Sequence, residues 1–200
     1  MAAETFAVFA ATLGVILLLR HWPGLSGQWW LTPAILIGAG MVPFLARRQS
    51  LPAIVRIETL RGDLWTLLLA SLVVFPATYL TTWLIAWAGI SLPLTSARPS
   101  DYAAWIAYQF FYVAVAEEVF FRGYLLTSLQ ALFGGGAAIV VSAACFAAAH
   151  VVLQGQITAA LTFLPGLILG WLFVRTGTLL APMLFHGMAN VFWLFLVRCS

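Results

Sequence analysis

Long runs of apolar residues constrain the fold of this chain more than any other feature of its sequence. Of the 200 residues, 64% are hydrophobic and 8% are charged, whereas a soluble domain carries about 25% charged residues. A helix needs about 17–25 apolar residues to cross the hydrocarbon core of a bilayer. We therefore predict an all-α, polytopic transmembrane helical bundle of about seven spans, at residues 3–19, 29–46, 64–90, 102–132, 137–153, 157–174 and 179–197.

The distribution of arginines predicts how the bundle is oriented. All nine basic residues are arginine, and four of them lie between the second and third predicted spans: Arg47, Arg48, Arg56 and Arg61. By the positive-inside rule this loop is cytoplasmic, which places the N-terminus inside and the C-terminus outside. Most of the net charge of +3 comes from loop arginines, so it does not indicate a nucleic-acid partner. The first run lacks a basic n-region, and we expect it to be a retained span rather than a removed signal peptide.

The fourth run contains three charged residues in an otherwise apolar segment: Glu117, Glu118 and Arg122. Each such group costs about 2.5–3.5 kcal/mol near the centre of a bilayer. Glu118 and Arg122 are four residues apart, so on a helix they share a face and we expect a structural ion pair. Glu117 points about 100° away from Glu118 and has no partner at helical spacing. An unpaired carboxylate at membrane depth predicts a functional site.

The fifth and seventh runs add three polar side chains at depth, which are His150, His186 and Asn190. Alone, either histidine could be hydrogen-bonded to a neighbouring helix, and Asn190 could join two helices. The small residues before His150 allow a close neighbour, and His186 and Asn190 project from one face because they are four residues apart. Together with Glu117, these residues predict one site between the fourth, fifth and seventh spans.

The depths of the site residues conflict with straight, regular spans. Counted along full crossings, Glu117 lies toward the inner end of its span and His150 toward the outer end of the next. The fourth run is also too long for one straight crossing. We therefore expect a broken, short or tilted span, or else one of the two residues does not belong to the site.

This set of side chains fits the hydrolysis of an amide inside the membrane. A carboxylate paired with a neutral histidine can hold and deprotonate water, while a second histidine and an asparagine amide can donate to an oxyanion. Two histidines and one glutamate are also a known catalytic zinc ligand set, so zinc at Glu117, His150 and His186 is an alternative, although the sequence has no H-E-x-x-H motif. Haem ligation by the two histidines and proton transport by Glu117 are further alternatives.

Three short motifs resemble those of one family. The run EEVFFRGYL, which begins at Glu117, resembles the EExxxR motif of the CPBP family (CAAX protease and bacteriocin-processing) of intramembrane proteases. Phe146 and His150 resemble its FxxxH motif, and His186 and Asn190 resemble its HxxxN motif. The resemblance covers residues 103–197, about half of the chain.

The resemblance implies a glutamate-dependent intramembrane endopeptidase without a metal. It implies that Glu117 and His150 activate water, that His186 and Asn190 stabilise the oxyanion, and that Glu118 and Arg122 brace the site. Because the sequence shows no second domain, internal repeat or low-complexity segment, we predict one integral membrane domain, 1–200, with N-terminal spans in 1–100 and the catalytic core in 101–200.

The expected substrate is a membrane-anchored protein or a lipidated peptide, cut near its C-terminus within the lipid bilayer. Eukaryotic relatives remove the last three residues of prenylated proteins, whereas some small bacterial members process C-terminal sorting tails. The short chain with arginine as its only basic residue suggests a bacterial protein in the inner (cytoplasmic) membrane. The alternative is a non-catalytic member that serves as a bacteriocin immunity protein or a membrane scaffold.

Overall fold

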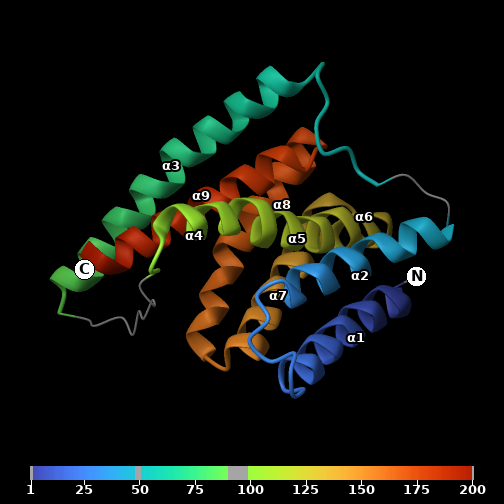
Figure 1. The fold of residues 1–200 in the computed structure, drawn as a ribbon. Coiled ribbons are helices and arrows are strands. Elements are labelled where there is room, and N and C mark those ends of the chain that lie inside the picture. Colours follow the sequence, from blue (N-terminus) through green and yellow to red (C-terminus); the bar gives the residue numbers. More distant parts are fainter. Residues whose placement is uncertain (1, 48–50, 90–98, 200) are drawn as a thin grey trace.

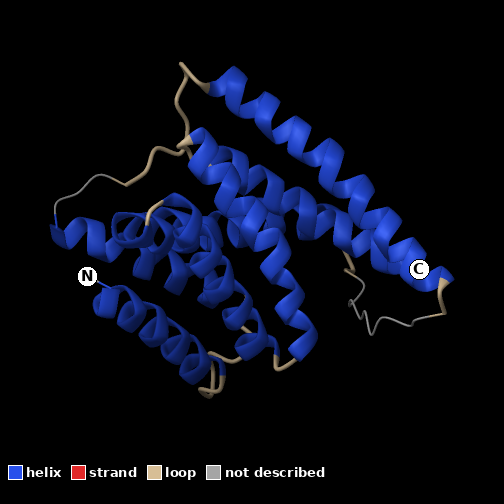
Figure 2. Ribbon diagram, turned by 180° about the vertical axis from the view of Figure 1, so that it is seen from behind, coloured by secondary structure: helices blue, strands red, loops and turns tan. Residues whose placement is uncertain are grey.

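The computed structural model describes residues 2–47, 51–89 and 99–199, with side chains up to residue 196, and its described residues form helices and loops without a strand (Figures 1 and 2). This confirms the predicted all-α class. The α-helices are α1 (Ala2–Arg20), α2 (Leu31–Arg47), α3 (Leu60–Trp87), α4 (Tyr102–Tyr108), α5 (Val115–Glu118), α6 (Thr127–Phe133), α7 (Gly135–Gln154), α8 (Phe163–Thr176) and α9 (Leu180–Cys199). Two π-helical segments, η1 (Gln109–Ala114) and η2 (Val119–Leu126), and a 3₁₀ helix, η3 (Ile157–Thr162), complete the helical elements.

The helices of the described residues match the predicted spans in order. Four of them are long and apolar enough to cross a membrane, namely Ala2–Arg20, Leu60–Trp87, Gly135–Gln154 and Ile157–Thr176. Two more apolar helices are shorter, at Leu31–Arg47 and Leu180–Leu196. The protein is therefore a multi-pass integral membrane protein with a helical-bundle fold. Arg48 and residue 90, the end of the third predicted span, lie outside the described residues.

The fourth predicted span is a single helical rod rather than a regular α-helix. The elements α4, η1, α5, η2 and α6 follow one another from Tyr102 to Phe133 without an intervening loop. In a π-helical turn the hydrogen bonds join residues five apart, and such turns are frequently found at functional sites. They change which side chains share a face, so the spacing and depth of residues along this rod differ from those of a regular helix. Glu117 and Glu118 lie on the short α5, between the two π-helical segments.

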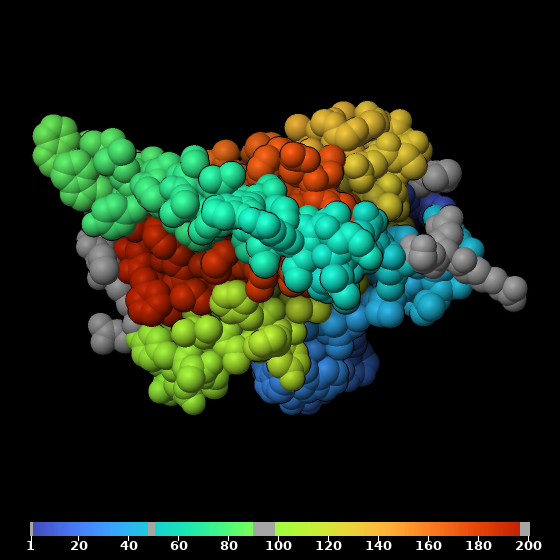
Figure 3. Space-filling view, turned by 90° about the horizontal axis from the view of Figure 1, so that it is seen from above, coloured from blue at the N-terminus to red at the C-terminus, as the bar shows by residue number. Residues whose placement is uncertain are grey.

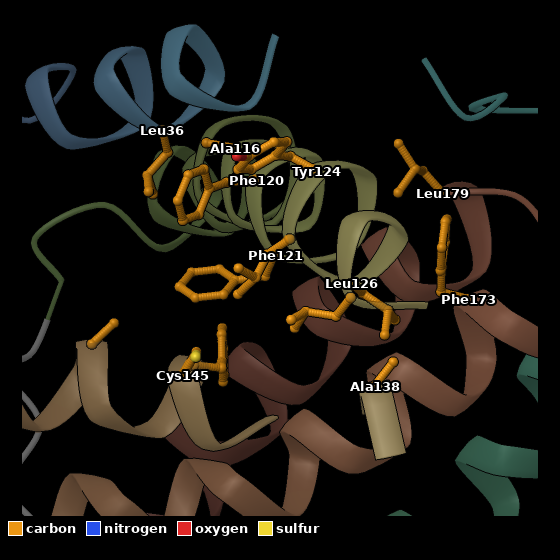
Figure 4. Close-up of a cluster of buried hydrophobic side chains, with 14 of the residues drawn as sticks. Leu36, Ala116, Phe120, Phe121, Tyr124, Leu126, Ala138, Cys145, Phe173 and Leu179 are labelled. Atoms are coloured by element: carbon orange, nitrogen blue, oxygen red, sulfur yellow. The ribbon is translucent and has the colours of Figure 1, made fainter. Parts of the chain in front are cut away.

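The rod of α4 to α6 runs beside α9 through the middle of the molecule, whereas α7 and α8 run across this direction (Figure 1). Helices α2 and α8 each pack closely against a neighbouring helix at a glycine. A Cβ atom on Gly40 of α2 would lie 3.2 Å from the Cα of Phe120 in η2, and one on Gly166 of α8 would lie 3.2 Å from the Cβ of Ala143 in α7. The main cluster of buried apolar side chains surrounds η2 and includes Phe120 and Phe121 (Figure 4).

Helix α3 lies on the outside of the bundle, over α9 (Figure 3). The loop before α3 is joined to the beginning of α9. The backbone N–H groups of Leu179 and Leu180 donate to the carbonyls of Ala53 and Ile54, at 3.0 and 2.9 Å. The hydroxyl of Thr178 donates to the buried carboxylate of Asp63 at 2.9 Å. These three bonds connect the N-terminal half of the chain to the helix that carries His186 and Asn190.

Candidate active site

The structure brings Glu117, His150 and His186 together from three different helices. Glu117 comes from α5 in the middle of the rod, His150 from the last turns of α7, and His186 from α9. The Nε2 atoms of His150 and His186 lie 3.9 and 3.7 Å from the Oε2 atom of Glu117. Straight spans would place Glu117 and His150 at different depths. The irregular rod and the crossing direction of α7 instead bring these two side chains together.

Glu118 and Arg122 form the ion pair expected from their spacing. Both side chains are fully buried, and the Nη1 atom of Arg122 donates to the Oε1 atom of Glu118 at 2.8 Å. The Nη2 atom of Arg122 donates to the carbonyl of Gly166 at 3.1 Å, and the guanidinium lies 4.7 Å from the centre of the Phe146 ring. The arginine thus fixes the rod against α7 and α8. A buried charge pair of this kind needs such additional bonds to offset its desolvation.

Glu118 also binds His186. The spacing of residues along one helix could not reveal this contact, because the two residues lie on different helices. The Nδ1 atom of His186 lies 2.7 Å from Glu118 Oε1. An ionised carboxylate accepts hydrogen bonds, so Nδ1 carries a proton and the Nε2 atom of the ring faces Glu117. Glu118 therefore sets both the orientation of His186 and the nitrogen that His186 presents to the site.

Phe146 supports His150 through its backbone and its ring. The Nδ1 atom of His150 lies 2.9 Å from the Phe146 carbonyl, which can only accept, so Nδ1 is the donor and Nε2 is turned toward Glu117. The Phe146 ring packs against the rings of His150 and His186, with centroids 4.4 and 5.9 Å apart. The sequence signal for this role is the spacing of four residues between Phe146 and His150.

Glu117 is the carboxylate without a close partner. Its side chain is 16% exposed, and its Oε2 atom is buried without a hydrogen bond. The distances from Oε2 to the two histidines exceed the range of a direct hydrogen bond. The side chain of His150 is 19% exposed, whereas those of Glu118 and Arg122 are fully buried. The site is thus reachable from the surface at Glu117 and His150 and closed behind them.

Asn190 lies one turn after His186 on α9, and its Nδ2 atom donates to the Oε1 atom of Gln109 at 2.8 Å. Gln109 is the first residue of η1. Gln109 is not among the predicted site residues, because a neutral amide hardly interrupts an apolar run. Its only signal was a polar side chain at the start of the fourth run.

The metal alternative concerns the three groups that face one another at the centre of the site. Among the described residues, no group of three or more His, Cys, Asp and Glu side chains is arranged to hold a metal ion. The Nδ1 atoms of both histidines are held by acceptors, an arrangement that zinc ligands also use. Glu117, His150 and His186 are therefore side chains of the types that bind zinc, but they are not arranged as a zinc site. Zinc stays an alternative that an experiment can test.

A comparison with protein families gives one match, over residues 99–192, to the family described as type II CAAX prenyl endopeptidase Rce1-like. The matched segment contains the rod and every predicted site residue. Comparisons with curated proteins and with solved structures give no match.

Proposed function

We propose that the chain is a CAAX-type intramembrane protease, because residues 99–192 match the family described as type II CAAX prenyl endopeptidase Rce1-like. In our proposal Glu117 and His150 activate a water molecule for attack on a peptide bond. The observation that carries this proposal is the buried Oε2 atom of Glu117, which has no hydrogen bond and faces the Nε2 atoms of two histidines.

The hydrogen-bonding state of the histidines supports a water molecule at this point. Because the Phe146 carbonyl accepts a hydrogen bond from Nδ1 of His150, the neutral ring of His150 presents a lone pair at Nε2. Two acceptor atoms, Glu117 Oε2 and His150 Nε2, would then face each other across 3.9 Å. A polar contact longer than 3.5 Å suits a bridging water, and water supplies the donors that this group lacks.

The proposed role of His186 requires a proton on both of its nitrogens. Its Nδ1 atom lies 2.7 Å from Oε1 of Glu118, and its Nε2 atom lies 3.7 Å from Oε2 of Glu117. Only in this form does Nε2 become a donor. The protonated form is therefore the one that can stabilise an oxyanion.

The proposed reaction uses these groups in sequence. The water donates one O–H to Glu117 and the other to His150, and its oxygen bonds to the carbonyl carbon as Glu117 takes the first proton. The electrons of the C=O bond move to oxygen, which accepts hydrogen bonds from His186 Nε2 and the Asn190 amide. The C–N bond then breaks, and the Glu117 proton passes to the departing nitrogen. As the C–N bond breaks, the electrons of the oxyanion return to re-form the C=O bond, and the second proton of the water passes through His150 to the amine. The products are a new C-terminal carboxylate and a protonated amine, and Glu117 is again a carboxylate.

The proposed substrate is a membrane-anchored protein or a lipidated peptide that is cut near its C-terminus. The site lies within apolar helices and is exposed only in part, so a substrate that shares the bilayer can reach it without crossing an aqueous phase. Processing of a CAAX-like end or of a C-terminal sorting tail, in a bacterial inner membrane, is the specific form that we propose.

The test compares the wild type with Glu117→Gln, which keeps the size of the side chain and removes its charge. Glu58→Gln is the matched control, because Glu58 is exposed in the loop before α3. The proteins are purified in detergent and assayed on farnesylated C-terminal peptides and on peptides with a short motif followed by a transmembrane helix, with and without a chelator. We expect Glu117→Gln to lower kcat by about 10²–10⁴-fold, as loss of a general base does, and the control and the chelator to have no effect.

Three outcomes would contradict parts of the proposal. Wild-type cleavage by Glu117→Gln would show that Glu117 is not the base. Loss of cleavage with chelator and its recovery with Zn²⁺ would assign a metal to Glu117, His150 and His186. Failure of the wild type to cut any peptide of the panel, at detergent concentrations that keep it folded, would favour the non-catalytic immunity or scaffold role.

A further inference from the structure

Three consecutive residues at the junction of α4 and η1 are attached to other parts of the bundle. The hydroxyl of Tyr108 donates to the carbonyl of Trp29 at 2.9 Å. Gln109 accepts from Asn190 at 2.8 Å. The ring of Phe110 lies against Gly187, where a Cβ atom would be 2.5 Å from the ring. The beginning of η1 is therefore held from two sides, and one of these sides is the helix that carries His186 and Asn190.

We propose that Gln109 is a positioning residue of the active site, which orients the carboxamide of Asn190 for its hydrogen bond to the oxyanion. This inference rests on the proposed function, because it assigns Gln109 a role through Asn190. In the part of the chain that the structure describes, Gln109 is hydrogen-bonded to Asn190 and not to Glu117 or to either histidine.

The geometry of the amide gives Gln109 this role. A primary amide has two N–H donors in one plane with its carbonyl. When one N–H is donated to Gln109, the direction of the second N–H is fixed as well. An oxyanion donor is effective when it is already oriented before the charge develops, since no reorganisation is then needed. Without Gln109 the side chain of Asn190 can rotate away from this direction.

The contact between Phe110 and Gly187 makes the position of Gln109 precise. Any side chain at Gly187 would overlap the Phe110 ring, so η1 and α9 approach at a distance that only glycine permits. Gly187 lies directly after His186 and three residues before Asn190, on the same side of α9 as Asn190. The close approach of Phe110 to Gly187 and the hydrogen bond between Gln109 and Asn190 therefore fix the same stretch of α9.

The π-helical conformation contributes by setting the direction of the side chain. Gln109 begins η1, and Glu117 follows after η1 on α5. In a regular α-helix, residues 109 and 117 would be separated by slightly more than two turns of 3.6 residues. The wider turns of η1 change this angular relation. The π-helical segment thus allows Gln109 to face Asn190 while Glu117 faces the histidines.

The test measures kcat and KM on a peptide that the wild type cuts. Gln109→Met removes the acceptor at nearly constant length, and Gln109→Glu keeps an acceptor. Gln130→Met is the matched control, because Gln130 lies on the same rod in α6, away from the site. We expect Gln109→Met to lower kcat about 10–100-fold with KM unchanged, as misplacement of a catalytic group does, and Gln109→Glu to restore most of kcat. Asn190→Ala alone and Gln109→Met/Asn190→Ala should have equal kcat.

Several results would overturn this inference. They are wild-type kcat in Gln109→Met, kcat losses that multiply in the double variant, or a rise of KM alone. If Gln109→Met does not fold in detergent, Gln109→Glu decides, because a loss of kcat there contradicts the role of Gln109 as an acceptor. Glu117→Gln in the same assay separates the two proposals. If Glu117→Gln is inactive and Gln109→Met is not impaired, only the inference about Gln109 fails, whereas an active Glu117→Gln contradicts the proposed function itself.

Discussion

Apart from Asp63 in its first turn, which accepts a hydrogen bond from Thr178, helix α3 differs from the rod of α4 to α6 in where its polar side chains find their partners. Along α3, four hydroxyls donate to the carbonyl four residues earlier in the same helix, at 2.8–2.9 Å; these belong to Thr66, Ser71, Thr78 and Thr82. In the rod, Gln109, Glu118 and Arg122 bind groups on α9 and α8. A helix that faces lipid must satisfy its polar groups internally, whereas a helix inside the bundle can share them with its neighbours.

The two regions also differ in regularity. Helix α3 is one α-helix of 28 residues that continues through Pro76, and much of its surface is exposed. The rod contains two π-helical segments and is buried around η2. The difference indicates that irregular backbone is found where other helices hold it in place, and this is also where the candidate site lies.

The largest effect on stability is expected from Arg122→Met, which removes one partner of the buried ion pair. The variant leaves the Glu118 carboxylate without its arginine in an interior that is fully buried. Breaking such a pair costs about 3–5 kcal/mol of the free energy of unfolding. Reversible unfolding in mixed detergent measures this loss. A loss below about 1 kcal/mol would show that water or His186 compensates the charge and that the rod depends less on its partners than we infer.

A smaller loss is expected from Gly187→Ala, which tests the close approach of η1 and α9. The new methyl group would lie 2.5 Å from the Phe110 ring, and overpacking of this kind costs about 1–3 kcal/mol. Gly38→Ala in α2 is the matched control, because a Cβ atom there meets nothing within 4 Å. Adding Phe110→Leu to Gly187→Ala should recover part of the loss. Equal unfolding free energies for the Gly187 and Gly38 variants would contradict the described packing.

The smallest effect is expected on α3, from Ser71→Ala and Thr78→Val. Each hydroxyl is bonded within its own helix, so its removal leaves no other helix with an unpaired group. Changes within about 0.5 kcal/mol are usual for such sites. A loss as large as that of Arg122→Met, measured by the same unfolding assay, would mean that α3 is held by polar contacts and would remove the contrast between the two regions.

The fold class could be predicted because apolar runs of this length have few alternatives to membrane helices. The ion pair of Glu118 and Arg122 also follows from local spacing, and the structure contains it. The π-helical segments could not be predicted, because the apolar pattern of residues 102–132 is compatible with a regular helix. The assumption of straight crossings therefore placed Glu117 and His150 at different depths.

Contacts between distant residues limited the prediction of the site. Glu118 and His186 are assigned separate roles, as a structural group and an oxyanion donor, but His186 is hydrogen-bonded to Glu118, which lies 68 residues earlier in the chain. Gln109 lies 81 residues from Asn190, and nothing in its local sequence connects the two. The catalytic roles of Glu117, His150, His186 and Asn190 stay predictions, and the proximity of Glu117 to the two histidines is what the structure adds to them.

The bonds between the loop before α3 and the beginning of α9 have a consequence for the modularity of the protein. The family match begins at residue 99, yet the N–H groups of Leu179 and Leu180 are paired with carbonyls of Ala53 and Ile54. A foreign N-terminal half joined to residues 99–192 would have to offer two carbonyls and a carboxylate at the same place. The segment that the family shares is thus not an exchangeable unit here, and its last helix depends on a part of the chain to which the family match does not extend.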